Sequence, residues 1–169
     1  MTKRTELRLQ DFSDTDIGRV RSVNQDQAFS WVLNPPRRDP LALLMGADGT
    51  GGHPAGKVAS ELAIETIAES LVPHLEQDWS ESPPPTAELV RALREAIQKA
   101  NAVIHRHAQR SLGSASDMGA TIAAVLVQGD QAVIANVGDS RVYLLDESGL
   151  EQLTEDHTPV GELVEEGLL

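Results

Sequence analysis

The stretch that most constrains this chain is residues 46–56, GADGTGGHPAG, in which an aspartate is followed by several glycines. It comes directly after residues 41–45, LALLM, a short continuous apolar run that predicts a buried strand. Beyond the loop, a helix is predicted by apolar residues at every fourth position: Ala59, Ala63, Ile67 and Leu71. Asp48 therefore stands where a buried strand opens to solvent, and a carboxylate there has to be hydrogen-bonded, paired or bound to a cation.

Three interpretations of this loop are open from the residues alone. The first is a tight turn with an exposed acid, because short Asp-Gly motifs are frequent by chance. The second is a phosphate-binding P-loop, since residues 51–57 match GxxxxGK between a strand and a helix. Against it, Val58 replaces the required hydroxyl and Pro54 lacks a backbone N–H. The third is a metal corner, in which Asp48 and a main-chain carbonyl of the glycine loop bind a hard cation.

Composition narrows the class of protein. The chain has 169 residues, 40% of them hydrophobic, which is enough for one domain with a buried core, and we assign residues 6–169 to it. The formal net charge of −12 argues against nucleic acid or an anionic membrane as a partner. The sequence contains no cysteine, which excludes disulfides, thiolate zinc sites and cysteine nucleophiles. We expect a soluble, cytoplasmic protein, because no apolar leader or membrane-span pattern is present. We also expect it to be a monomer.

The hydrophobic pattern predicts an α+β fold, with two helices between an early hairpin and a late set of strands. Residues 6–10 alternate around Leu7 and Leu9, which predicts a half-buried first strand, and a second strand begins near Ala28. We expect the first helix to end near Pro73.

The second helix is expected to begin at Thr86 as N-cap and to bury one face, made of Leu89, Leu93, Ile97, Ala100 and Ile104. Two strands follow, in residues 119–127 and 132–137, and a Gly-Asp pair at 129–130 predicts a hairpin between them. A further strand over 141–145, a turn and a short strand around 152–153 complete the pattern.

Polar residues crowd the loop before the second strand, including Arg21, Asn24, Gln25 and Asp26. Alone, this loop is typical of a solvated surface segment. Beside a metal corner it has another interpretation, because an arginine suits the oxygens of a phosphate and an acid can hold metal-bound waters. Residues 136–141 likewise fit a simple turn when taken by themselves.

Five motifs follow one another along the chain: RVRSVNQD (19–26), LLMGADGTGGHPAG (43–56), GATIAAVLV (119–127), NVGDSR (136–141) and LTEDHTPV (153–160). In this order they resemble the PPM-type metal-dependent serine/threonine protein phosphatases, especially compact bacterial members. The resemblance implies a four-layer α-β-β-α sandwich of antiparallel sheets flanked by helices. It also implies a binuclear Mg²⁺ or Mn²⁺ site at one end of the sandwich.

The resemblance implies a role for five residues. Asp48 matches the aspartate that bridges both metals, and Gly49 matches the residue that gives a backbone carbonyl to one of them. Asp26 matches the acid that orders metal-bound water, and Arg21 matches the arginine that binds the substrate phosphate. Asp139 matches an acid implicated in a third, weaker metal site.

Two positions depart from the family pattern. Gln25 stands where many relatives carry glutamate, which puts the role of that second carboxylate in doubt. Thr50 occupies a position that is histidine in some relatives, so a histidine general acid cannot be assigned there.

The reaction implied is direct hydrolysis of phosphoserine and phosphothreonine in proteins, by a water activated between two metal ions, in opposition to a serine/threonine kinase. An alternative is a binding or regulatory module that keeps the fold without the chemistry. The sequence stops at Leu169, before two further aspartate motifs of the family. We therefore expect the fold and the metal site to be incomplete in this chain, and residues 1–169 alone to hydrolyse phosphopeptides poorly.

Overall fold

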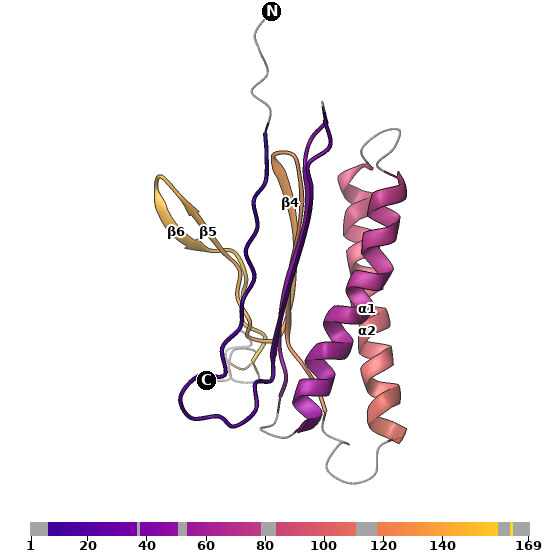
Figure 1. Cartoon of the computed structure of the whole chain (residues 1–169), viewed down its shortest axis with the longest axis vertical. Coiled ribbons are helices and arrows are strands. Elements are labelled where there is room, and N and C mark those ends of the chain that lie inside the picture. Colours follow the sequence, from indigo (N-terminus) through magenta and orange to yellow (C-terminus); the bar gives the residue numbers. More distant parts are fainter. Residues whose placement is uncertain are drawn as a thin grey trace, which may run out of the picture.

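The computed structural model describes residues 7–36, 38–50, 54–78, 84–110, 118–158 and 163. Two helices cover one face of a four-stranded sheet, and a two-stranded hairpin lies on the opposite side (Figure 1). The elements in chain order are β1 (Asp26–Leu33), β2 (Leu41–Asp48), α1 (Pro54–Asp78), α2 (Thr86–Arg110), β3 (Ile122–Gln128), β4 (Gln131–Val137), β5 (Tyr143–Asp146) and β6 (Gly149–Gln152). The predicted α+β class with antiparallel sheets and flanking helices is confirmed.

Strand β2 lies inside the sheet, between β1 and β3, and pairs antiparallel with both. Successive side chains of a strand point to opposite faces. Leu41, Leu43 and Met45 belong to the core under the helices and are 0%, 0% and 5% exposed. The alternate residues of β2, from Ala42 to Asp48, therefore face away from the helices.

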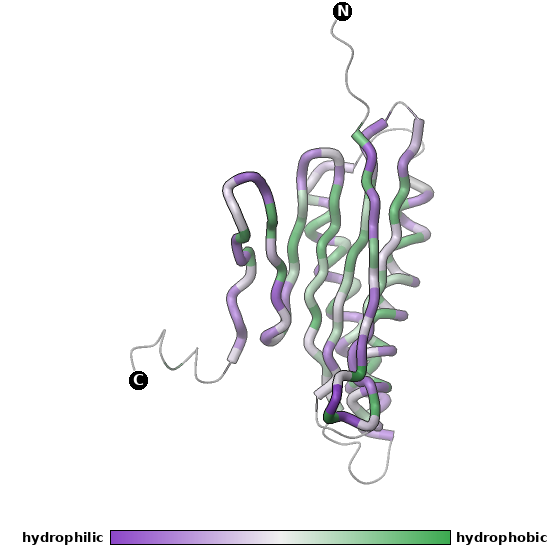
Figure 2. Tube along the Cα trace, turned by 60° about the vertical axis from the view of Figure 1, so that its left-hand side comes forward, coloured by the Kyte–Doolittle hydropathy of each residue, from purple (hydrophilic) through white to green (hydrophobic). Residues whose placement is uncertain are grey.

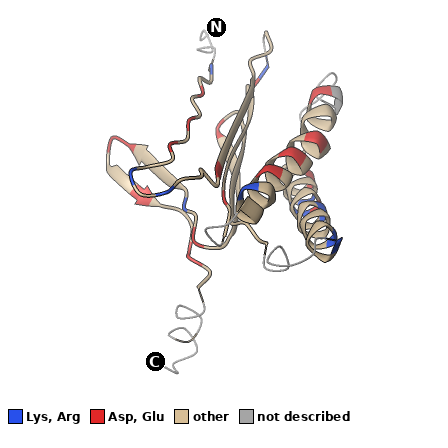
Figure 3. Cartoon of the chain, turned by 60° about the horizontal axis from the view of Figure 1, so that its bottom comes forward, with Lys and Arg blue, Asp and Glu red and all other residues tan. Residues whose placement is uncertain are grey.

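The helices bury the faces that the sequence predicted. All four predicted residues of α1 are buried, and in α2 Leu89, Leu93 and Ala100 are buried while Ile97 and Ile104 are partly so. Hydrophobic residues also follow the strands of the sheet (Figure 2). Acidic residues are spaced along α1, and basic residues are spaced along α2 (Figure 3). Within the described residues, neither helix has the length and apolar character that a membrane crossing requires.

The face of the sheet away from the helices borders a hollow of about 830 Å³. Residues 12–16 of the N-terminal segment and residues 140–143 also line it. Figure 1 shows this N-terminal segment running beside the sheet, opposite α1 and α2. The hairpin of β5 and β6 is exposed, with Leu145 at 75% and Leu150 at 67%. The only apolar core in the described part of the chain that is covered on both sides is thus the one between the sheet and the helices.

The prediction of a first strand at residues 6–10 is wrong over the described residues 7–10, which form no strand. Both backbone groups of Leu9 are bonded by the side chain of Asn34, whose Oδ1 accepts from the N–H at 2.9 Å and whose Nδ2 donates to the carbonyl at 3.0 Å. A side-chain amide has taken the place of a neighbouring strand.

Two predicted helix boundaries are also wrong. Helix α1 continues through Pro73 to Asp78, because Leu71 and Leu75 on either side of the proline are buried in the core. Thr86 is the first residue of α2, not a cap, because its Oγ1 donates to Gln131 Oε1 at 2.7 Å. The backbone N–H groups of Glu88 and Leu89, in the first turn, donate instead to the carbonyl of Pro85.

The predicted strands from Ala28 onward are confirmed, with shifted bounds. Gly129 joins β3 to β4 at φ +60°, as the Gly-Asp signal predicted. Strand β5 begins at Tyr143 and not at Arg141, because Arg141 and Val142 are bonded to residues 154–156.

We expect Leu43→Ala to lower the free energy of unfolding by about 2–5 kcal/mol, because it opens a cavity in the core under the helices. Leu44→Ala is the matched control, since Leu44 lies on the other face and lines the hollow, and should cost less. Urea unfolding of both variants measures the difference. Equal losses would contradict the two-faced sheet.

Candidate metal centre

Two aspartates meet at the end of the sheet. Asp26 of β1 and Asp48 of β2 are directly opposite each other in the antiparallel ladder. Opposite residues point to the same face, with Cβ atoms about 4.5–5.5 Å apart. Both aspartates line the hollow on the face away from the helices. The register therefore places two carboxyl groups side by side.

The electrostatics of this pair are unfavourable without a cation. Partial burial raises the pKa of Asp48, and a hydrogen bond to the Asp26 side chain and the charge of Asp26 raise it further. The charge of Asp139 acts in the same direction, while that of Arg21 lowers the pKa of Asp48. Crowded carboxylates of this kind are the donors that Mg²⁺ and Mn²⁺ prefer. The residues present fit a hard divalent cation.

The loop of residues 19–26 is held against the sheet by Gln25, which is only 5% exposed. Its carbonyl accepts from Ser60 Oγ of α1 at 2.6 Å and from the Gly49 N–H at 3.1 Å. Its side-chain Oε1 accepts from Arg21 Nη1 at 3.0 Å. Arg21 thus lies in a small polar cleft of about 120 Å³ that Asp26 and Asp48 also line.

Gly49 needs to be glycine because of the close approach of α1. A Cβ atom at this position would collide with the carbonyl oxygen of Gly56. On the next residue, both the N–H and the Oγ1 of Thr50 donate to the carbonyl of Gly119, at 2.9 and 3.1 Å. Gly49 and Thr50 are therefore fixed where the chain leaves β2, and residues 51–53 lie outside the described residues. Lys57 pairs with Glu61 along α1 at 3.6 Å.

Asp139 belongs to the corner after β4 and is exposed. Its charge acts on Asp48, but in the part of the chain that the structure describes no three His, Asp or Glu side chains are grouped so that they could hold a metal ion. The structure thus brings Asp26 and Asp48 together, with Asp139 nearby and not in one cluster with them.

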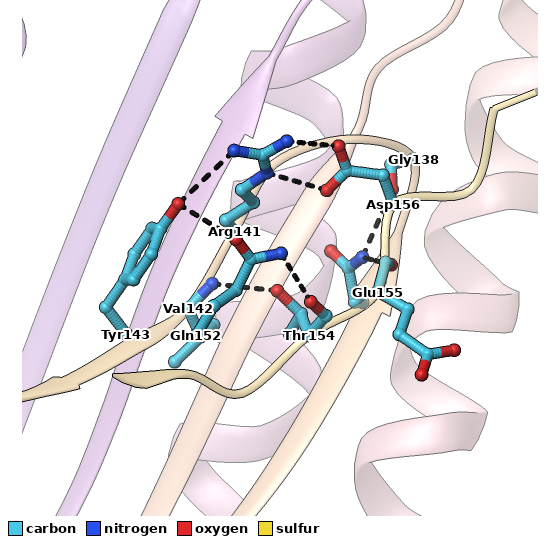
Figure 4. Close-up of polar contacts among 9 residues, drawn as sticks. Gly138, Arg141, Val142, Tyr143, Gln152, Thr154, Glu155 and Asp156 are labelled. Atoms are coloured by element: carbon cyan, nitrogen blue, oxygen red, sulfur yellow. Dashed lines mark hydrogen bonds and ion pairs between the residues drawn. The ribbon is translucent and has the colours of Figure 1, made fainter. Parts of the chain in front are cut away.

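The last motif is tied to this corner by an ion pair (Figure 4). Arg141 donates from Nε and Nη2 to the two carboxylate oxygens of Asp156, at 2.7 and 2.6 Å. The hydrogen bond from Arg141 holds the pKa of Asp156 below its usual value. The His157 N–H donates to the Gly138 carbonyl at 2.9 Å. Asp156 is therefore paired with Arg141 and is a poor candidate for the metal.

Sequence reasoning assigned no supporting role to three residues that hold the site: Gln25, Ser60 and Thr121. Thr121 lies between Asp48 and the corner of residues 136–141, and both its backbone and its side chain bond Asp48. The sequence weakly indicated a role for Thr121, since it is the one hydroxyl residue at the start of an apolar strand pattern. Nothing in the sequence pointed to Ser60, whose hydroxyl is buried in α1.

Comparison with known proteins places the chain in a family. Residues 18–166 match the family model for protein phosphatase 2C, and the chain belongs to this family. It is 40% identical over 155 residues to a serine/threonine phosphatase, stp, of Listeria welshimeri. This match covers 90% of this chain and 56% of the relative. The chain thus spans about half the length of this curated relative.

Solved structures agree with this membership. The S. agalactiae serine/threonine phosphatase matches 91% of this chain and 58% of its own, with a TM-score of 0.72 and 34% identity. The catalytic domain of the serine/threonine protein phosphatase PstP, solved in complex with two manganese ions, matches 90% of this chain and 57% of its own, with a TM-score of 0.67 and 34% identity. The fold described above is therefore part of a protein phosphatase 2C fold.

We expect Asp48→Asn to stabilise the metal-free chain at pH 7. Because the folded state raises the pKa of Asp48, the folded chain holds this proton more tightly, and stability falls as the pH rises above about 3.8. Asparagine removes that charge, so the melting temperature of the variant should exceed that of the wild type at neutral pH and match it in acid.

Added Mg²⁺ provides the second half of this experiment. The wild type should gain stability with metal concentration, whereas the Asp48→Asn variant should not. Asp130→Asn, the same charge change on an exposed hairpin turn, serves as the control and should behave as the wild type. A metal-free Asp48→Asn variant less stable than the wild type would contradict the strained carboxyl pair.

Proposed function

We propose that this chain carries the metal-binding half of a domain that hydrolyses phosphoserine and phosphothreonine in proteins. The observation that carries the proposal is the carboxyl pair of Asp26 and Asp48 beside Arg21, in one small cleft. Membership of the protein phosphatase 2C family supports it. The alternative of a non-catalytic module is not favoured by any of these observations.

The metal would be Mg²⁺ or Mn²⁺, held by the carboxylates of Asp48 and Asp26 and by the backbone carbonyl of Gly49. Asp139 would contribute to a further, weaker position. When bound, the metal supplies Lewis-acid activation of the attacking water and screens the phosphoryl oxygens. The relative solved with two manganese ions supports this choice of metal.

Arg21 would bind the phosphate of the substrate. A guanidinium group has five N–H donors in a planar fork, which suits phosphate oxygens. Gln25 accepts from one of them through a neutral amide, at 3.0 Å, so the side chain is oriented without being neutralised by an acid. This gives Gln25 a role in the site although it carries no charge.

The substrates would be proteins phosphorylated by a serine/threonine kinase. Named relatives that are serine/threonine phosphatases support this substrate class. The cytoplasmic location, the monomeric state and the single domain over residues 6–169 stay predictions from the sequence.

The proposed function is tested with the complete gene product and a phosphothreonine peptide. Turnover should require Mn²⁺ or Mg²⁺, stop on chelation, and be abolished in Asp48→Asn. A phosphotyrosine peptide of the same sequence is the control for substrate class. Undiminished turnover by Asp48→Asn would refute the metal corner, and Mn²⁺ binding without turnover would favour the non-catalytic module.

We expect Arg21→Ala to raise KM about 10- to 100-fold, as expected for lost charge-assisted hydrogen bonds worth about 1.5–3 kcal/mol. Its melting temperature should change little, because removing uniform substrate binding affects KM first. Arg19→Ala, two residues earlier in the same loop, is the matched control and should retain the wild-type KM. A large loss of stability with an unchanged KM would instead assign Arg21 a structural role.

A further inference from the structure

Thr121 forms hydrogen bonds with both the backbone N–H and the backbone carbonyl of Asp48. The Asp48 N–H donates to Thr121 Oγ1 at 3.2 Å, and the Thr121 N–H donates to the Asp48 carbonyl at 2.8 Å. The two residues are separated by 73 positions in the chain and meet only because β2 and β3 pair. The main chain of Asp48 is thus held by one residue of the neighbouring strand.

The same hydroxyl reaches the corner that carries Asp139. Thr121 Oγ1 lies 2.5 Å from Ser140 Oγ, and Ser140 directly follows Asp139. A hydroxyl has one donor and two acceptor positions, so Thr121 can bond Asp48 and Ser140 at the same time. Thr121 therefore joins the backbone of one candidate metal ligand to the neighbour of another.

The methyl group of Thr121 lies against Gly138. Gly138 has φ +97°, and a Cβ atom there would lie 2.6 Å from Thr121 Cγ2. The ladder pairs Ile122 with Val137, so Gly138 comes next opposite Thr121. Both branches of the threonine thus fit the corner, the hydroxyl against Ser140 and the methyl against Gly138.

We propose that Thr121 is a positioning residue that couples Asp48 to the corner bearing Asp139, so that a divalent cation bound at Asp48 also affects that corner. The inference rests on the proposed function for the metal centre and adds to it a residue that touches neither metal nor substrate. Partners that orient metal ligands typically matter 10- to 100-fold in metal affinity. A merely structural threonine would stabilise the fold without linking the two aspartates.

The test compares Thr121→Val, which keeps the shape and removes the hydroxyl, with Thr121→Ser, which keeps the hydroxyl. Mg²⁺ is titrated into the ¹⁵N-labelled chain, and the backbone amide signals of Asp48 and Asp139 are followed by NMR. Ser140→Ala removes only the arm to the corner and is the second variant if Thr121→Val does not fold. Ser70→Ala, which removes a hydroxyl from α1 away from the sheet end, is the control.

In the wild type, Thr121→Ser and Ser70→Ala, both amides should shift with one common midpoint. In Thr121→Val the midpoint should rise about tenfold or more, and the Asp139 shift should separate from that of Asp48. Ser140→Ala should lose the Asp139 response while keeping that of Asp48. A Thr121→Val midpoint within twofold of the wild type, with both amides still moving together, would overturn the inference.

A failure of the proposed metal centre is distinguishable from a failure of this coupling. If Mg²⁺ moves neither amide in the wild type, the metal assignment is refuted. Metal-free hydrogen exchange then still tests the bridge, because the Asp48 amide should exchange faster in Thr121→Val than in Thr121→Ser. Equal exchange in the two variants would refute the positioning role itself.

Discussion

The antiparallel pairing of β2 with both β1 and β3 is the constraint on which the rest of the structure depends. It buries the apolar side of β2 under the two helices and turns the other side toward the hollow. The same register brings Asp26 opposite Asp48 at the point where the strand leaves the core. The core and the candidate site are therefore two consequences of one alignment, and a shift of one residue would move the aspartates to the helix side.

The candidate site is held in an electrostatically costly state. Partial burial, the hydrogen bond to Asp26, the charge of Asp26 and the charge of Asp139 all raise the pKa of Asp48. A fold does not gain stability from such crowding, and acids with a perturbed pKa in a cleft are typical of functional sites. Gln25 fits this picture, because a neutral amide orients Arg21 without adding a further negative charge.

The two late motifs, NVGDSR and LTEDHTPV, are connected by direct contacts in the structure. Residues 136–141 alone fit a simple turn, residues 153–158 form no helix or strand, and every residue of the intervening strands β5 and β6 is exposed. The ion pair of Arg141 with Asp156 and the bond from His157 to Gly138 join them. Their order along the chain thus reflects one corner of the structure, in which the second motif holds the first beside Thr121 and Asp48.

Local pattern was enough to determine some of this protein. The buried run of residues 41–45, the buried faces of both helices and the hairpin at Gly129 follow from periodicity and turn chemistry, which act between near neighbours. Tertiary contacts decided the rest: buried leucines carry α1 through Pro73, and the side chain of Asn34 replaces a strand partner for Leu9. Tertiary structure also decided the contact between Asp48 and Thr121. These residues are 73 positions apart, and the register between strands, which no local sequence pattern encodes, brings them together.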